Sequence, residues 1–129
     1  MELISNYCKE QYEFVKESRA VLFEYCKTIS PEDFVDQNNS FGRGGSIRNL
    51  IVHVANTYEY WIANMALKKN RFYAEYENFK TIQEVIMLFV EIDNFMFNFI
   101  LKWTLLKMKY HTKYKMSKIQ QIRSGFLAM

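Results

Sequence analysis

Apolar residues recur every three or four positions through three long stretches of the chain, and charged residues fill the positions between them. This spacing predicts amphipathic helices. The first helix is expected from about residue 3 to residue 28, because Pro31 disfavours helical geometry at Ser30. The second is expected from Ile47 to about Lys69, with Ser46 as its N-cap.

The third helix opens with Thr81-Ile82-Gln83-Glu84, which has the pattern of a capping box. No glycine or proline follows until Gly125. Such a run is too long for one ordinary helix of a small domain. We therefore expect a break between Lys102 and Lys113, followed by a fourth helix that ends before Gly125.

Two connections separate the three helices. The segment Ser30-Pro31-Glu32-Asp33 predicts a single helical turn capped by Ser30. The loop from Asp36 to Gly45 is polar and contains three glycines, but it lacks the Walker pattern and preceding strand of a phosphate-binding loop. We interpret it as a plain interhelical loop. The link from Asn70 to Lys80 is aromatic and is expected to pack against the helices.

The composition agrees with one helical domain over residues 1–129. Half of the residues are hydrophobic and 24% are charged, which is too apolar for a disordered chain. Four glycines and one proline are too few for the turns of a β-sandwich or barrel. The sequence therefore predicts an all-α, single-domain helical bundle.

Cysteine usage and the apolar segments bear on the cellular location. Cys8 and Cys26 lie on the same predicted helix, too far apart to form a disulfide, so reduced thiols are expected. No basic region followed by an apolar run opens the chain. The most apolar window of the chain, from Ile82 to Leu101, contains Glu84, Glu91 and Asp93 and so does not have the pattern of a transmembrane helix. We expect a cytoplasmic protein that neither crosses nor binds a membrane.

Charge is distributed unevenly. Residues 102–129 hold seven basic residues and no acidic one, whereas the preceding 101 residues hold ten basic and fourteen acidic residues. This atypical basic tail raises the question of nucleic-acid binding. Because the acidic remainder offers no basic stripe to extend such a surface, we expect no nucleic-acid partner.

The motifs of common enzymes are missing from the sequence. It contains no Gly-x-Ser-x-Gly, no Cys-x-x-Cys and no His-Glu-x-x-His, so no catalytic residue is assigned. His53 and His111 are the only two histidines. A single histidine beside an apolar helical stripe, such as His53, is more often a hydrogen-bonded interior residue than a metal ligand.

The stretch from Ser46 to Trp61 resembles the second helix of the DinB/YfiT-like superfamily, in which an initial Ser or Thr is followed by an aliphatic pair, a histidine, and then Glu and Trp. The Ser-Pro-Glu-Asp-Phe segment and the Thr-Ile-Gln-Glu-Val segment resemble further landmarks of that family. The resemblance covers residues 1 to about 101. It implies a DinB-like four-helix bundle, often dimeric, which here has a shortened or degenerate fourth helix.

The resemblance also implies a divalent metal such as zinc, nickel or iron, held by three histidines. His53 matches the ligand position on the second helix, and His111 is the candidate on the fourth. The remaining ligand position then falls on Lys115, whose ammonium is a poor ligand. A carboxylate such as Glu59 or Asp93 could complete the set, but Glu59 lies about 240° around the helix from His53.

Two functional hypotheses follow. The first is a DinB-like protein of unassigned activity, related to metal-dependent thiol transferases and isomerases, whose incomplete histidine site leaves weak or absent metal binding and activity. It would take a small thiol or another small molecule as ligand. The alternative is a non-catalytic helical module for dimerisation or binding. In either case a homodimer is expected, because a shortened fourth helix leaves apolar faces uncovered.

The basic tail itself has two interpretations. It could be a degenerate fourth helix that closes the bundle through Met108, Ile119, Ile122 and Phe126. Alternatively, its abrupt loss of acidic residues could mark a truncated or frame-disrupted end.

Overall fold

The computed structural model describes residues 2–38 and 45–127, and it is helical wherever it is regular. Within these residues no strand occurs, which confirms the all-α prediction. The helical elements follow one another along the chain as α1 (Glu2–Cys26), α2 (Pro31–Val35), α3 (Ile47–Tyr58), the π-helix η1 (Glu59–Ala66), the short 3₁₀-helix η2 (Tyr76–Asn78) and α4 (Ile82–Leu127).

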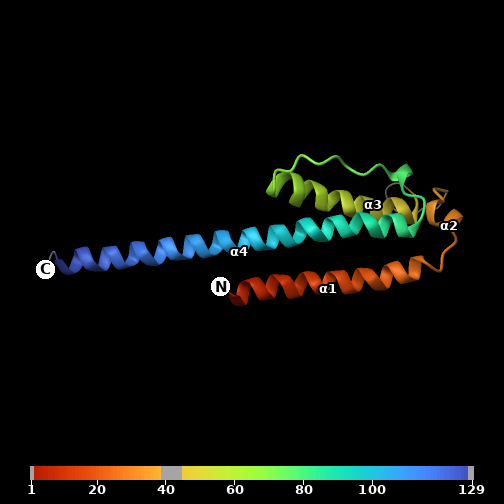
Figure 1. Ribbon diagram of the computed structural model, residues 1–129. Helices are drawn as coiled ribbons and strands as arrows, with labels where there is room; N and C mark the ends of the chain where they lie inside the picture. Colours follow the sequence, from red (N-terminus) through yellow and green to blue (C-terminus); the bar gives the residue numbers. More distant parts are fainter. Residues whose placement is uncertain (1, 39–44, 128–129) are drawn as a thin grey trace.

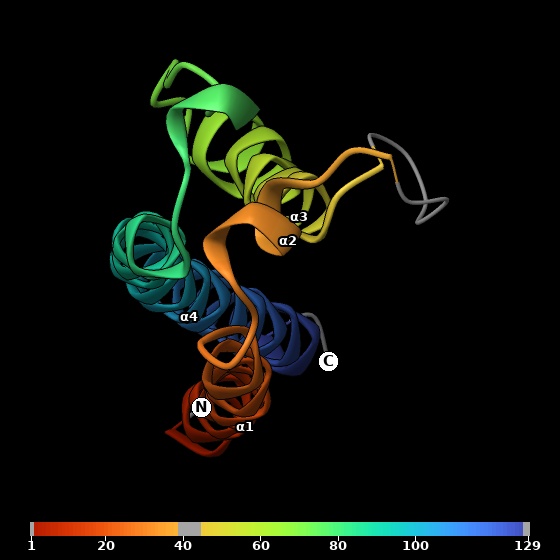
Figure 2. The same ribbon diagram turned by 90° about the vertical axis from the view of Figure 1, so that its right-hand side faces the viewer.

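Three long helical rods lie side by side (Figure 1). The chain runs out along α1, returns along α3 and η1, comes back through an extended connection, and then runs along α4 in the same direction as α3. Viewed along the rods, α4 lies between α1 and α3 and packs against both (Figure 2). Three corners of a four-helix bundle are therefore present.

The predicted helix starts agree with the structure. Ser30 accepts a hydrogen bond from the Asp33 amide at 3.1 Å, and Ser46 accepts one from Asn49 at 2.9 Å. The Glu84 amide donates to Thr81 Oγ1 at 3.3 Å. These side chains satisfy amide donors that the first turn of a helix leaves unpaired. Local sequence therefore sets where α2, α3 and α4 begin.

The core lies where α4 meets α1, α2 and α3. Buried side chains come from all four helices and form one cluster. Phe23 and Phe89 make an edge-to-face contact across the α1–α4 interface, with ring centroids 5.4 Å apart. Phe34 anchors the five-residue α2 in the same core. The cluster runs along α4 through Ile82, Val85, Phe89, Ile92 and Phe95.

The connection between η1 and α4 is attached only in part as expected. Tyr76 and Phe79 pack against the core, whereas Phe72 is 96% exposed and Tyr73 is half exposed. The amide groups of two asparagines hold the part of the link nearer to η1. Asn56 makes a pair of hydrogen bonds, of 2.8 and 3.0 Å, with the backbone of Ala74. Asn64 makes a similar pair with Arg71. Side-chain amides thus replace the main-chain partners that an irregular segment lacks.

The largest correction concerns α4. The break expected between Lys102 and Lys113 is absent, because α4 is one helix of 46 residues. The abnormal fourth helix is real, but it is a continuation of the third long helix rather than a separate rod. The second half of α4 extends well beyond the N-terminal end of α1 (Figure 1). The helix therefore does not close the bundle of its own chain.

Candidate functional site

The missing corner of the bundle is an apolar groove between α1 and α3. One part of it is a hollow of about 270 Å³, with Phe89 of α4 among its lining residues. A second hollow of about 360 Å³ continues from Val54 along the same face of α3 and η1. We call these two hollows together the α1/α3 groove. It is lined by Arg19, Leu22, Phe23, Ile47, Leu50, Ile51, Val54, Thr57, Tyr58, Trp61, Ile62 and Phe89.

Several large apolar side chains of this groove are open to solvent. Leu22 is 47% exposed, Val54 is 48% exposed and Trp61 is 59% exposed. Exposed apolar surface of this extent, continuous along two helices, marks an interaction site in a folded protein. The groove is therefore the strongest candidate for a functional surface.

Two groups of charged residues hold the walls of the groove against α4. On the α1 side, Asp93 Oδ1 accepts hydrogen bonds from the Tyr12 hydroxyl at 2.5 Å and from Arg19 Nη2 at 2.6 Å. Burial, reinforced by the hydrogen bond to Asp93, raises the pKa of the Tyr12 hydroxyl well above its usual value. The Arg19 guanidinium also lies over the Phe89 ring, 4.6 Å from its centroid.

On the opposite wall, Arg71 links the π-helix to α4. Its Nε lies 3.1 Å from Glu59 Oε2, and its Nη2 donates to Glu91 Oε2 at 2.7 Å. Glu59 is only 2% exposed, and burial raises the pKa of its carboxyl group, which Arg71 opposes in part. Asp93 and Glu59 were the two carboxylates considered as additional metal ligands. In the structure Asp93 instead binds Tyr12 and Arg19, and Glu59 binds Arg71.

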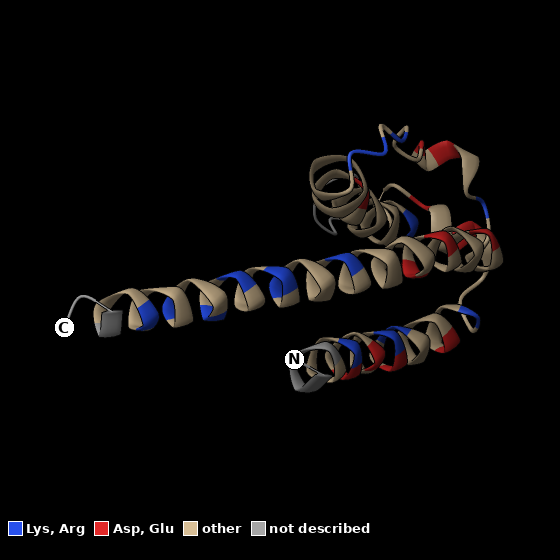
Figure 3. Ribbon diagram, turned by 60° about the vertical axis from the view of Figure 1, so that its left-hand side comes forward, with Lys and Arg blue, Asp and Glu red and all other residues tan. Residues whose placement is uncertain are grey.

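After Thr104, the described side chains of α4 are no longer buried against other helices. Every residue from 105 to 125 is exposed, and we call this stretch the projecting segment. It contains large apolar residues at high exposure, among them Leu105 at 56%, Ile119 at 51% and Ile122 at 67%. Lysines and Arg123 are its only charged residues (Figure 3). It is therefore both apolar and basic.

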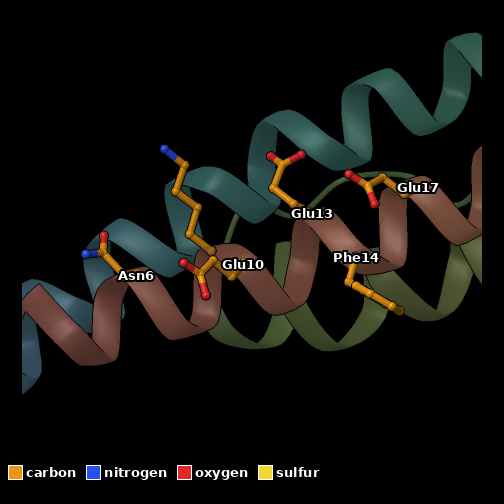
Figure 4. A pocket seen from close by; sticks show the side chains of 6 residues that line it. Asn6, Glu10, Glu13, Phe14 and Glu17 are labelled. Carbon is orange, nitrogen blue, oxygen red and sulfur yellow. The ribbon is translucent and has the colours of Figure 1, made fainter.

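A shallow acidic surface lies on α1. Glu10, Glu13 and Glu17 line a hollow of about 560 Å³ together with Asn6 and Lys9. The exposed ring of Phe14 lies among them and points away from Glu13 (Figure 4). Acidic side chains thus run beside an uncovered apolar residue on α1.

The two histidines proposed as metal ligands lie in different parts of the molecule. His53 is exposed on α3, so its interpretation as a hydrogen-bonded interior residue is wrong. His111 is exposed on the projecting segment, as is Lys115. Over residues 2–38 and 45–127, no three His, Cys, Asp or Glu side chains are grouped so as to hold a metal ion. The donors present in one chain therefore do not fit the three-histidine centre that the family resemblance implies.

Uncovered apolar faces were expected from the shortened fourth helix, but their position between α1 and α3 and the ion pairs were not anticipated, although one signal for the ion pairs was available. Val52, Ala55, Glu59 and Ala63 follow one another at spacings of three and four, and all four are buried. Their spacing would have placed Glu59 on the inner face of its helix. The groove itself has no sequence signal, because it depends on which corner of the bundle stays empty.

Comparisons with known proteins agree with the architecture. A family model described as the DinB family matches residues 4–124. No curated protein and no solved structure matches the chain. No helix in the described part of the chain has the length and apolar character needed to cross a membrane. Since the family match spans nearly all of the helical bundle and the projecting segment, the chain belongs to the DinB family.

Proposed function

We propose that this DinB-family chain works as a non-catalytic helical module that dimerises through the α1/α3 groove. The observation that carries the proposal is the groove itself, whose apolar side chains stay exposed although α1 and α3 are fixed on either side of α4. A bundle with an uncovered apolar corner gains stability by covering it with another helix.

The alternative within the family is metal-dependent chemistry on a small thiol. It rests on the resemblance of the His53 helix, and the donor set gives it little support. His53 is exposed, the position four residues after His111 is a lysine, and Glu59 and Asp93 are engaged in ion pairs. We therefore favour the binding module over the enzyme.

Sedimentation equilibrium of the full chain tests the proposal. We expect a species of twice the 15.6 kDa chain mass. Val54→Asp should shift it to the monomer, because the groove would then have to bury an unpaired carboxylate. Met87→Asp is the matched control, since Met87 is exposed on α4 outside the groove. A monomer at millimolar concentration, or equal effects of the two substitutions, would overturn the proposal.

A further inference from the structure

We propose that two copies of the chain exchange their projecting segments, so that residues 105–125 of each copy fill the α1/α3 groove of the other as its fourth helix. This inference rests on the proposed dimerisation and names the part of the second copy that occupies the groove. Four observations carry it: the position of the groove, the length of the segment, its surface chemistry, and the continuity of α4.

The position of the groove suits an exchanged helix. The empty corner lies between α1 and α3 and faces α4 (Figure 2). In a dimer with a two-fold axis across α4 near Thr104, the partner's α4 runs antiparallel to α4 of the first copy. The projecting segment of the partner then enters the groove in the direction in which a folded-back fourth helix would run.

The length of the segment matches the groove. The projecting segment, from residue 105 to residue 125, measures about 31 Å at 1.5 Å per residue. The wall formed by α3 and η1, from Ile47 to Ala66, contains twenty residues. The opposite wall, α1, contains twenty-five. One projecting segment therefore spans the groove from end to end.

The surface of the segment is complementary to the groove in polarity, and its net charge is opposite to that of the rest of the chain. Leu105, Met108, Met116, Ile119 and Ile122 lie within about 120° of one another around the helix, which gives it an apolar stripe. The basic tail has no acidic residue to pair with, whereas residues 1–101 carry a net charge of −4. Exchange places the basic segment against the acidic body of a second copy.

Continuity of α4 selects a second copy as the source of this helix. An antiparallel helical hairpin needs a connecting loop of about two to five residues. The junction instead contains regular helix, in which the Thr104 hydroxyl donates to the Ile100 carbonyl at 2.8 Å. Without a loop, the segment cannot turn back into its own groove. The same contacts are available only in another copy.

The decisive experiment uses paired full-length variants in sedimentation equilibrium. Ile119→Asp places a charge in the apolar stripe of the segment, and Val54→Asp places one in the groove. Each should raise the dimer dissociation constant about a hundredfold, since each dimer loses both of its exchanged contacts. Tyr110→Asp is the control for the segment, because Tyr110 is 66% exposed and lies on the other side of the helix.

Mixing the two damaged variants then distinguishes exchange from other dimers. A heterodimer keeps one intact contact, in which the unaltered segment of the Val54→Asp chain enters the unaltered groove of the Ile119→Asp chain. We expect a heterodimer about tenfold tighter than either homodimer. Circular dichroism of each variant should match the parent chain, since both substituted side chains are exposed in the free chain.

The remaining outcomes separate the two proposals. A parent dimer that Val54→Asp dissociates but Ile119→Asp does not would keep the groove as the interface and overturn exchange. A parent chain that stays monomeric would overturn both. Inserting four flexible residues after Leu105 supplies the missing loop and should convert the dimer into a monomer of unchanged helix content. A dimer of unchanged affinity after this insertion would contradict exchange.

Discussion

The two halves of α4 share one backbone conformation and differ in everything that surrounds them. From Ile82 to Thr104 the helix supplies the central face of the core, and Val85 and Ile92 are completely buried. From residue 105 to residue 125 every side chain is exposed. Helix geometry alone thus does not create a core. The difference arises because α1 and α3 cover only the first half.

The halves also differ in how their charges are paired. In the first half, Asp93 and Glu91 are joined to arginines on neighbouring elements. In the second half, the described contacts of the basic side chains include only local ring contacts, such as Lys107 over Trp103 and Lys118 over Tyr114. The acidic side chains of the first half are therefore paired within one chain, whereas the basic side chains of the second half have the features of a surface that binds a partner.

The largest contrast is expected from matched isoleucines on the two halves. Ile92→Ala should lower the free energy of unfolding by about 4 kcal/mol, because it leaves a cavity in the core. Ile122→Ala should change it by less than about 0.5 kcal/mol in the dilute monomer. Urea unfolding followed by circular dichroism measures both. Equal losses at high dilution would show that the projecting segment packs within its own chain.

A second comparison is between two ion pairs, the mostly buried Arg19–Asp93 pair that links α1 to α4 and the exposed Lys27–Glu24 pair at the end of α1. Asp93→Ala should cost about 3 kcal/mol, since it leaves Tyr12 and the mostly buried Arg19 without their acceptor. Glu24→Ala, which removes the exposed Lys27–Glu24 pair, should cost less than about 0.5 kcal/mol. Chemical denaturation of the two variants compares them directly. A small loss for Asp93→Ala would mean that this network does not hold α1.

A pH effect is expected from Glu59. Burial raises the pKa of its carboxyl group in the folded state, so the folded chain keeps this proton at pH values where the unfolded chain has lost it. Stability from this group is full below the ordinary pKa of 4.5 and is lost as pH rises through the raised folded value.

Glu59→Gln removes this titration. The difference in unfolding free energy between the parent chain and Glu59→Gln should therefore fall as pH rises from about 4 toward neutrality. Urea titrations at several pH values measure the difference. A difference that grows with pH would show that Arg71 outweighs burial and holds the pKa low.

The smallest effect is expected at the histidine of α3. Because His53 is exposed, His53→Ala should change the unfolding free energy by less than about 0.5 kcal/mol. Protein purified without a chelator should carry well under one equivalent of zinc, nickel or iron, as judged by elemental analysis. Stoichiometric metal that disappears in His53→Ala would show that a second chain, or a donor outside the described residues, completes a site.

Much of the local structure could be read from the sequence. The first helix ends close to its expected limit, and Ser30, Ser46 and Thr81 cap the helices that follow them. These features depend on neighbouring residues, so a local pattern suffices. The switch from α-helix to π-helix at Glu59 was not predicted. The second helix was predicted to run to about Lys69. In the structure its helical path continues to Ala66, with π-helical hydrogen bonding after Tyr58.

Predictions that required knowledge of long-range packing were less accurate. His53 was interpreted as an interior residue beside an apolar stripe, yet the structure leaves it exposed on α3. Of the residues expected to close the bundle, Met108, Ile119 and Ile122 are exposed, and the side chain of Phe126 lies outside the described residues. A stripe shows that a face is apolar, but it does not show which helix covers that face.

The sequence by itself determined the all-α class, the family, the helix starts and the separation of an acidic body from a basic tail. Each of these follows from composition or from residues a few positions apart. The unbroken α4 is also compatible with the sequence alone, since no glycine or proline interrupts it before Gly125, although a break was expected there. Only the tertiary structure decided that the corner between α1 and α3 is left open. The physical reason is that helix formation is local, whereas burial of an apolar face depends on which other helix reaches it.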